Sequence, residues 1–470
     1  MYFEQFYLGC LAHASYMLAS EGEAVVVDPQ RDVELYLKAA ADHGVTIKHI
    51  FETHLHADFV SGHKELAART GAKIYMGAQA GATFAHVPVT DGYELPFGKA
   101  AIRVLETPGH TPESICLVVT DQVVTDTEKS PAPWAVLTGD TLFIGDVGRP
   151  DLSPRHTPAQ LAGLLYDSLH EKVLKLPDNV LVYPAHGAGS LCGKNMRAER
   201  SSTIGTERLT NYALQIKTRD EFIAQLTSNL PARPEYFMKD AEINRTGAAP
   251  LSELPALRAI APKELQGMLA EGEVALDVRP GDEFAAEHVP GSVNIALSGQ
   301  FASWTATVLG LSARPVLIAG ADEQIEEARV RLARVGMEAL GGQLQGGVAA
   351  WKQAGLPVAT IEQVSVQDLA ARMRSEAVQV LDVRRAPEWD AAHLESATWW
   401  PLDNFKVAPP EMDQGSPIAV HCKGGYRSMI AASLLQRAGF RNVVNVVGGF
   451  DAWQQAGLPT ASSKAVGTTS

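Results

Sequence analysis

Three histidines and an aspartate crowd into one short stretch near the N-terminus. Residues 53–63 read THLHADFVSGH, so that His54, His56 and Asp58 follow an apolar run. Imidazole and carboxylate groups are the ligands that suit zinc, iron and manganese. The cluster therefore predicts a metal site. It leaves open whether the site holds one ion for oxygen chemistry or two ions for hydrolysis.

Further residues of ligand type end other apolar runs in the first 230 or so residues. His110 ends AIRVLETPGH, Asp140 ends AVLTGD, and His186 lies in VLVYPAHG. Short runs rich in Val, Ile and Leu that end in polar residues predict strands of a buried sheet, with the functional groups at the strand ends. One such histidine would more often be an ordinary loop residue. Several of them in one α/β domain favour a shared metal site.

The length and composition indicate a multidomain protein, and its four cysteines are expected to be free thiols. A chain of 470 residues with 46% hydrophobic and 20% charged residues is too long for one core, and about three domains are expected. We expect no membrane span, and the net charge of −14 argues against a nucleic-acid partner. The four cysteines form no CxxC pair and we find no secretory signal. A reducing, cytoplasmic compartment is therefore expected, where a cysteine acts as a thiolate.

The C-terminal half contains an internal repeat. ALDVRPGDEFAAEHVPGS (275–292) resembles VLDVRRAPEWDAAHLESA (380–397), and GGVAAWKQAGLP (346–357) recurs as GGFDAWQQAGLP (448–459). Two copies of one α/β domain are therefore predicted. The expected boundaries are a first domain at 1–235, a proline-rich and polar linker at 236–257, the two repeats at 258–360 and 361–463, and a tail at 464–470.

The second repeat contains a candidate nucleophile. SPIAVHCKGGYRSMIAASLL (416–435) predicts a strand, a tight glycine loop and a helix, with Cys422 where the strand ends. Inward N–H groups at a helix N-terminus, together with Lys423 and Arg427, would lower the thiol pKa. The loop pattern HCx4R is one residue shorter than the HCx5R loop that wraps phosphate, which suits a single sulfur atom.

The first repeat lacks these groups. Gly320 aligns with Cys422 and Ile325 with Arg427, while Asp322 and Glu323 would repel an anion. We interpret this repeat as a domain that has lost its chemistry, serving as a spacer, an orienting module or an oligomerisation module.

Together these motifs resemble two known families. THLHADF, TPGHT, TGDTLF and YPAHG are similar to the metal-binding motifs of the metallo-β-lactamase fold, an αββα sandwich, and the cysteine loop with DVR and GGFDAW resembles the rhodanese domain. The resemblance implies an α/β multidomain fold with one sandwich and two rhodanese domains. It also implies that Cys422 carries a persulfide, in a cradle made by Gly424, Gly425, Tyr426 and Ser428.

The order of the domains is that of persulfide dioxygenase–rhodanese fusions. Two-metal hydrolases of the fold have a histidine where this chain has Phe59, which weakens a second metal site. The resemblance to persulfide dioxygenases implies one Fe(II) per chain, held by His54, His110 and Asp140. The other residues it places near the metal are His56, Asp58 and His186 around the ligands, and Arg149 of GDVGRPDL on the carboxylate of a thiol substrate. Cys192 lies a few residues after His186, so we expect it around the ligands, either carrying sulfur or gating the site, or as a small buried apolar residue.

The implied reaction uses sulfane sulfur twice. A persulfide of glutathione or of another small thiol would react with O2 to give sulfite and thiol, and the rhodanese domain would join sulfane sulfur to sulfite as thiosulfate, or run in reverse, in sulfide detoxification. A homo-oligomer, dimer or tetramer, is expected. The alternatives are a thioester hydrolase of the glyoxalase II kind, and a non-catalytic sulfur carrier or sensor.

Overall fold

The computed structural model of the chain contains two compact units. Its described residues are 1–121, 132–228, 230, 233–375, 377–407 and 410–462. The first unit comprises Met1–Leu254 with Ala333–Gly336, and the second comprises Pro255–Leu332 with Met337–Ser470. The expected tail at 464–470 lies outside the described residues. Within the described part, no helix is both long enough and apolar enough to cross a membrane.

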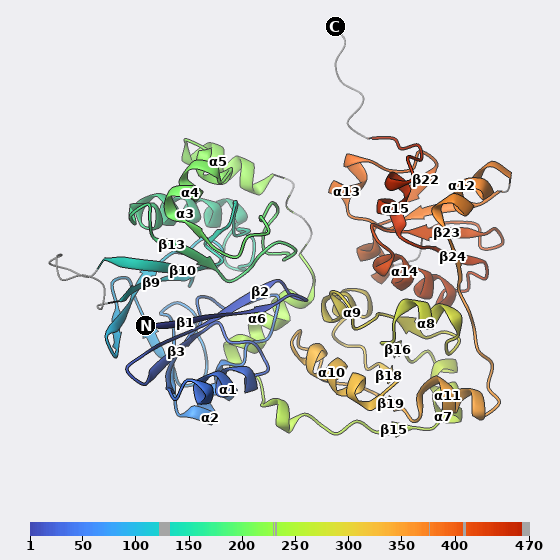
Figure 1. The fold of residues 1–470 in the computed structure, drawn as a ribbon, viewed down its shortest axis with the longest axis horizontal. Helices are drawn as coiled ribbons and strands as arrows, with labels where there is room; N and C mark the ends of the chain where they lie inside the picture. Colours follow the sequence, from blue (N-terminus) through green and yellow to red (C-terminus); the bar gives the residue numbers. More distant parts are fainter. Residues whose placement is uncertain (122–131, 229, 231–232, 376, 408–409, 463–470) are drawn as a thin grey trace, which may run out of the picture. The chain divides into compact units, whose positions relative to one another are not determined.

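Two six-stranded sheets form the centre of the first unit (Figure 1). The first sheet consists, in spatial order, of β1 (Tyr2–Leu8), β2 (His13–Ser20), β3 (Glu23–Val27), β4 (Thr46–Phe51), β5 (Lys73–Gly77) and β6 (Val87–Val89). The second consists of β14 (Ser202–Thr203), β13 (Leu181–Pro184), β10 (Pro133–Gly139), β9 (Ile115–Asp121), β8 (Ala100–Glu106) and β7 (Glu94–Phe97). A short hairpin, β11 (Leu142–Phe143) and β12 (Asp146–Val147), follows β10.

The two sheets pack face to face because their strands are apolar on both faces. On β3, Val25 and Val27 belong to the core between the sheets, whereas Val26 belongs to the core under the helices. On β9, Val119 faces the inner core and Val118 the outer one. This alternation with a period of two is that of a strand buried on both sides. The predicted αββα sandwich is confirmed.

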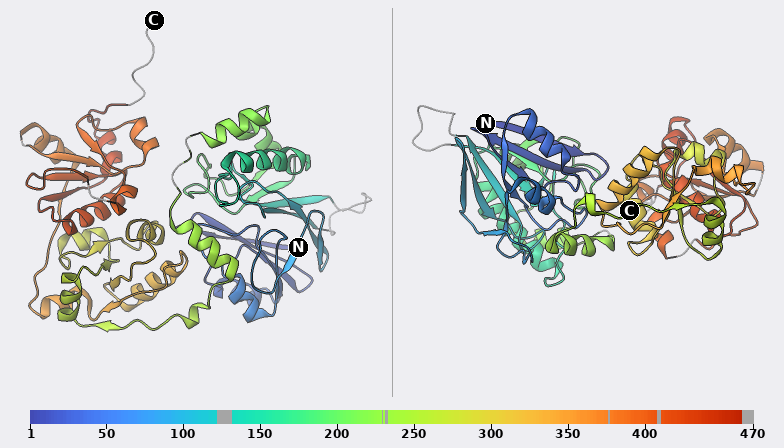
Figure 2. Two further views of the ribbon diagram at one scale, coloured as in Figure 1. Left: turned by 180° about the vertical axis from the view of Figure 1, so that it is seen from behind. Right: turned by 90° about the horizontal axis from the view of Figure 1, so that it is seen from below.

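Helices cover the outer faces of both sheets (Figure 2). The helices of this unit are α1 (Glu34–Asp42), α2 (His63–Thr70), α3 (Pro158–Glu171), α4 (Ile204–Thr210), α5 (Arg219–Thr227) and α6 (Tyr236–Thr246). Tyr36 of α1 and Leu66 of α2 pack on the first sheet, and Leu165 of α3 and Phe222 of α5 pack on the second. Helix α6 lies in the segment that we expected to be a linker, and its Phe237 is fully buried.

The second unit contains the same domain twice. The first copy has a parallel sheet ordered β15 (Ala259–Ile260), β19 (Gly342–Leu344), β18 (Val316–Ile318), β16 (Ala275–Asp277), β17 (Val293–Asn294), with helices α7 (Pro262–Ala270), α8 (Gly281–Ala286), α9 (Phe301–Leu309), α10 (Asp322–Ala333) and α11 (Gly347–Gln353). The second has β20 (Glu362–Val364), β24 (Val443–Val446), β23 (Ile418–His421), β21 (Gln379–Asp382), β22 (Ala397–Trp399), with α12 (Val366–Ser375), α13 (Ala386–Ala391), α14 (Tyr426–Arg437) and α15 (Gly449–Gln455). The strand order is identical, so the predicted repeat is confirmed, and Gly320 and Cys422 follow equivalent strands.

Candidate metal centre and cysteine loop

Three side chains from three strand ends converge in the first unit. His54 lies in the loop after β4, His110 in the loop after β8, and Asp140 directly after β10. The Asp140 Oδ2 atom is 3.3 Å from His110 Nε2 and 3.8 Å from His54 Nε2. All three residues are buried, and their ligand atoms lie within 4.8 Å of one another. The fold thus brings together the residues that the family resemblance assigns to iron.

The chemistry of these atoms fits a cation. None of the three has a hydrogen-bond partner among the described residues, although buried polar atoms are nearly always satisfied. Burial lowers the pKa of His54 and of His110, which keeps their lone pairs available. Burial alone would raise the pKa of Asp140, but the neighbouring imidazoles, led by His186, hold it well below its ordinary value. Two neutral imidazoles and one carboxylate suit a divalent metal such as Fe(II).

Each candidate ligand is oriented by a hydrogen-bonding group behind it, as metal ligands usually are. The contacts are His54 Nδ1 to Thr53 Oγ1 (3.0 Å), His110 Nδ1 to the Arg149 carbonyl oxygen (3.0 Å) and Asp140 Oδ1 to His186 Nδ1 (2.8 Å). His186 therefore orients the candidate ligand Asp140.

Two glycines let the loops approach this closely. Gly139 has φ +51°, and a Cβ there would lie 2.5 Å from Thr53 Oγ1. A Cβ on Gly148 would lie 2.0 Å from the Asp140 carbonyl oxygen and 2.9 Å from His110 Nδ1. Any larger residue at either position would displace the groups that position the candidate ligands.

His56 belongs to a separate buried cluster of carboxylates. Its Nε2 is 3.1 Å from Asp28 Oδ1 and 3.4 Å from Glu52 Oε2, and Glu52 also contacts His63 Nδ1 at 3.2 Å. Burial alone would lower the pKa of His56, but Asp28 and Glu52 raise it. His56 Nε2 therefore faces the two carboxylates of this cluster, and its expected place around the ligands stays a prediction.

Asp58, His186 and Cys192 form a third buried group. His186 Nε2 is 2.9 Å from Asp58 Oδ2, and the ligand atoms of all three residues lie within 4.8 Å of one another. Burial alone would lower the pKa of His186, but Asp140 and Asp58 raise it well above its ordinary value. Burial, reinforced by Asp58 and Asp140, raises the pKa of the Cys192 thiol.

Arg149, expected to bind a substrate carboxylate, pairs with Asp151 in the structure. Its guanidinium is buried and makes two bonds to Asp151, from Nε at 2.6 Å and from Nη2 at 2.9 Å, and Nη1 donates to the Leu191 carbonyl at 3.1 Å. A substrate carboxylate would have to displace Asp151. The backbone of Arg149 also positions the site, because its carbonyl faces His110 and its N–H donates to the Cys192 carbonyl at 3.0 Å.

His13 is a site residue that sequence reasoning missed. It starts β2, pairs with His186 in an isolated antiparallel bridge, and is fully buried. The centroid of its ring lies 4.1 Å from the ring centroid of Phe59 and 5.6 Å from that of His56. Neither ring nitrogen has a hydrogen-bond partner within the described ranges. The only signal in the sequence is one histidine at the start of the apolar run HASYMLA, which is typical of a core residue.

Asn244 of α6 fastens the loop that contains His56 and Asp58. Its Nδ2 donates to the carbonyl oxygens of His56 and Phe59, both at 2.7 Å, and its Oδ1 accepts from the Ser61 N–H at 2.8 Å. The residue is 1% exposed. Three bonds from one buried amide therefore fix the loop next to the candidate metal centre.

Replacing Asn244 by alanine should loosen this loop. Its partners would lose three buried bonds, each worth about 1–3 kcal/mol when left unsatisfied, and iron affinity should fall about tenfold. Hydrogen exchange of residues 56–61 should become faster. Arg245→Ala is the matched control, because its ion pair with Glu242 is exposed. Unchanged exchange protection in the Asn244 variant would contradict the assignment.

In the second repeat, Cys422 lies where β23 meets α14. The Gly425 N–H donates to Cys422 Sγ at 3.1 Å, and Gly425 has φ +112°, which glycine adopts readily. Helix α14 begins at Tyr426, directly after this loop. The dipole of the helix therefore favours a negative charge on the Cys422 sulfur. Cys422 itself is 1% exposed.

Three of the other loop residues line a cavity, and one is exposed to solvent. Gly424, Gly425 and Tyr426 line a cavity of about 280 Å³, which Asp282 and Asn294 of the first repeat also line. Lys423 is exposed. The first repeat thus contributes to the surroundings of the cysteine loop.

Ser428 and Arg427 point to partners within the protein. The Ser428 hydroxyl is fully buried, 3.0 Å from the Gly425 carbonyl oxygen and 2.8 Å from Asn445 Oδ1, so it stiffens the loop rather than facing a substrate. Arg427 forms a two-bonded ion pair with Glu388, with both distances 2.7 Å. Its charge is therefore shared between Glu388 and the loop.

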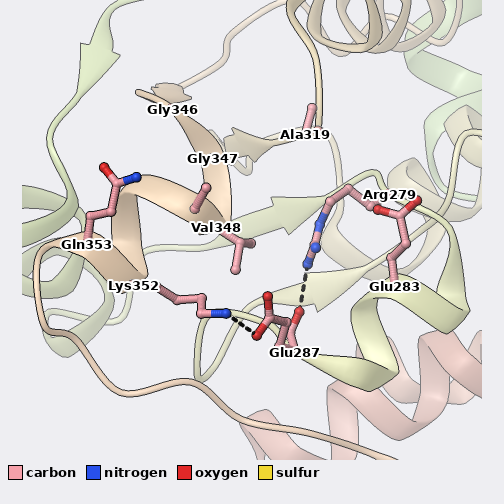
Figure 3. Close-up of a pocket in the computed structure, with 11 residues that line it drawn as sticks. Arg279, Glu283, Glu287, Ala319, Gly346, Gly347, Val348, Lys352 and Gln353 are labelled. Carbon is pink, nitrogen blue, oxygen red and sulfur yellow. Dashed lines mark hydrogen bonds and ion pairs between the residues drawn. The ribbon is translucent and has the colours of Figure 1, made fainter.

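The equivalent place in the first repeat contains no nucleophile. The Gln324 side-chain oxygen accepts from the N–H groups of Gly320 and Ala321, at 2.9 and 3.2 Å, and so takes up two donors of the loop. A cavity of about 470 Å³ lies beside it, where the Lys352 ammonium is bound to Glu287 (Figure 3). These contacts agree with a repeat that has lost its sulfur chemistry.

Comparisons with known proteins match both parts of the chain. The model of the metallo-beta-lactamase superfamily matches residues 8–186, and that of the rhodanese-like domain matches residues 261–354 and 365–456. A solved structure of a metallo-beta-lactamase from Staphylococcus aureus subsp. aureus COL has a TM-score of 0.65 and 31% identity, and covers 73% of this chain and 98% of that chain.

The chain covers a larger share of one curated relative than of another. Persulfide dioxygenase ETHE1, mitochondrial, of Bos taurus is 32% identical over 216 residues, which are 44% of this chain and 73% of that protein. Hydroxyacylglutathione hydrolase of Polaromonas sp. is 34% identical over 177 residues, which are 37% of this chain and 61% of that protein. The chain therefore belongs to the persulfide dioxygenase family of the metallo-β-lactamase superfamily, and two rhodanese-like domains follow its N-terminal sandwich.

Proposed function

We propose that the first unit is an Fe(II) persulfide dioxygenase with one iron per chain, and that the second unit is a sulfurtransferase. The observation that supports this most is that the facing ligand atoms of His54, His110 and Asp140 are buried, close together and without a hydrogen-bond partner among the described residues. Iron held by two imidazoles and one carboxylate supplies open positions for O2 and sulfur chemistry. The overall reaction is RSSH + O2 + H2O to RSH, sulfite and two protons.

The residues around the ligands hold the site ready for this reaction. His186 keeps Asp140 oriented through the 2.8 Å contact, and the Arg149 carbonyl fixes the ring of His110. Phe59 is buried and fills the place where two-metal hydrolases have an imidazole. This exchange, together with the shorter coverage of the hydrolase relative, supports oxygen chemistry over thioester hydrolysis.

The cysteine loop supports the second half-reaction. The Cys422 thiolate attacks the outer sulfur of RSSH, the S–S bond breaks, and RS⁻ leaves, so that Cys422 carries the sulfane sulfur. Sulfite then attacks that outer sulfur, which yields thiosulfate and restores the thiolate. The Gly425 N–H and the N-terminus of α14 stabilise the negative sulfur in both steps. Together the two reactions would remove persulfide, as in sulfide detoxification.

Oxygen uptake tests this proposal directly. The full chain, loaded anaerobically with Fe(II), is given glutathione persulfide, and a Zn(II)-loaded sample serves as the control. We expect uptake with iron only, accompanied by sulfite or thiosulfate. Absence of uptake with several different persulfides, from fully iron-loaded protein, would overturn the dioxygenase proposal and make thioester hydrolysis the next reaction to test.

A further inference from the structure

One face of helix α14 is bound to the first repeat along the whole length of the helix. Tyr426 and Arg437 are its first and last residues, and Ser433 lies between them. The spacing i, i+7, i+11 places these three side chains on one face of an α-helix. The bonds run from the Tyr426 hydroxyl to the Ala296 carbonyl oxygen (2.9 Å), from the Asn294 N–H to Ser433 Oγ (3.0 Å), and from Arg437 to the carbonyl oxygens of Gly291 (2.9 Å) and Gly272 (2.8 Å).

Two further side chains complete this face. Met429 is in close contact with Gly281, since a Cβ on the glycine would lie 3.2 Å from Met429 Cγ. Gln436 Oε1 is 3.0 Å from His288 Nε2, and Gln436 Nε2 donates to the Thr360 carbonyl oxygen at 2.8 Å. Packing and hydrogen bonds therefore hold α14 to the first repeat from its first turn to its last.

The edge of the first repeat's sheet is covered by α14, whereas the equivalent edge of the second repeat is more exposed. Strands β17 and β22 are these two edges, and Asn294 and Trp399 occupy equivalent positions on them, paired with Asp277 and Asp382. Asn294 is 1% exposed and Trp399 is 38% exposed. Proteins commonly cover a sheet edge, because its backbone groups are otherwise open to pairing. Helix α14 provides that cover for β17 through the bond to Asn294.

The start of the same helix holds the sulfur of the cysteine loop. The Gly425 N–H donates to Cys422 Sγ at 3.1 Å, and the Gly425 carbonyl oxygen accepts from the Met429 N–H at 3.2 Å in the first turn of α14. Tyr426 follows Gly425 directly, and its hydroxyl is bound to Ala296 of the first repeat. A shift of α14 against the first repeat would therefore move the N–H group that stabilises a negative sulfur.

We propose that the first repeat is a positioning module for Cys422, and that Tyr426 and Arg437 are the positioning residues at the two ends of α14. The first repeat has Gly320 in place of a nucleophile, but it fixes the helix that begins beside the nucleophile of the second repeat. A loop held in one place needs less reorganisation when negative charge forms on the sulfur. The inference rests on the proposed sulfur transfer by Cys422, and among the roles expected for the first repeat it selects orientation.

The pH dependence of Cys422 alkylation in the full-length protein tests this inference. Tyr426→Phe removes only the hydroxyl that binds Ala296. At neutral pH the rate of alkylation by iodoacetamide, followed by mass spectrometry of the Cys422 peptide, should fall about three- to tenfold. At high pH, where the thiol is ionised in both proteins, the rate should return to that of the unaltered protein. A change that only blocked access to the sulfur would instead slow alkylation equally at every pH.

The matched control is Tyr166→Phe. The Tyr166 hydroxyl likewise donates to a backbone carbonyl oxygen, that of Lys217, but in the first unit. This variant should keep the pH profile and the sulfur transfer rate of the unaltered protein, whereas Tyr426→Phe should slow sulfur transfer by the same factor as alkylation.

A second variant tests the far end of the helix. Arg437→Lys retains the positive charge, but an ammonium lacks the fork that reaches several carbonyl oxygens. It should also slow alkylation of Cys422 at neutral pH, although Arg437 lies at the opposite end of α14. The inference is overturned if either variant keeps the pH profile of the unaltered protein. If both profiles shift as expected but the unaltered protein transfers no sulfur, the proposed reaction of Cys422 fails and the positioning of its thiol stands.

Discussion

Alanine in place of His110 should abolish persulfide-dependent oxygen uptake and leave sulfur transfer by the rhodanese domain intact. His110 Nε2 is 3.3 Å from Asp140 Oδ2 and has no hydrogen-bond partner among the described residues, so its loss removes one of three candidate ligands. Changes behind a metal ligand already cost about 10–100-fold. Removal of the ligand itself should therefore lower uptake by more than about 100-fold.

Iron content and the two activities should be measured on the same sample. His43→Ala is the matched control, because His43 is an exposed histidine of the same unit at the C-terminal end of α1. It should retain iron, oxygen uptake and sulfur transfer. A His110 variant that keeps full iron content and full uptake would show that the metal is held elsewhere, and the proposed reaction would lose its centre.

The candidate metal centre could be predicted from sequence because its parts are local signals that recur. His54, His110 and Asp140 each end an apolar run, and the packing of the two sheets brings the end of β4 close to the ends of β8 and β10. The cysteine loop is likewise a local pattern, since the strand, the glycines and the helix are contiguous. In the cysteine loop the short-range sequence therefore determines where the functional sulfur lies.

The partners of those residues could not be predicted, because they depend on contacts between distant segments. The pairing of Arg149 with Asp151 is one such contact that the expected role of Arg149 did not include. Asn244 lies in a stretch without clear periodicity, yet α6 places its amide on the metal loop, 188 residues away in the sequence from His56. His13 is a lone histidine in an apolar strand, and only the sandwich brings it to Phe59.

The two halves of the chain are linked by their chemistry. The first unit would consume a persulfide and release sulfite, and the cysteine loop would use sulfite as the acceptor for another sulfane sulfur. In the first repeat, Gln324 takes up the loop N–H groups that would face a sulfur, and Gly320 replaces the nucleophile. Sulfur transfer should therefore depend on Cys422 alone, which a single substitution can test.

Serine in place of Cys422 should lower sulfur transfer by about 1,000-fold or more, because a hydroxyl cannot form the persulfide and loss of a nucleophile removes most of the catalysis. The side chain is nearly the same size and Gly425 can still donate to it, so the fold should be retained. Oxygen uptake by the first unit should continue, with sulfite accumulating in place of thiosulfate. Cys10→Ser, at a partly exposed cysteine, should leave both activities unchanged. If Cys422→Ser stopped oxygen uptake as well, the two half-reactions would be obligatorily coupled, and sulfite would have to pass to Cys422 before the first unit could turn over again.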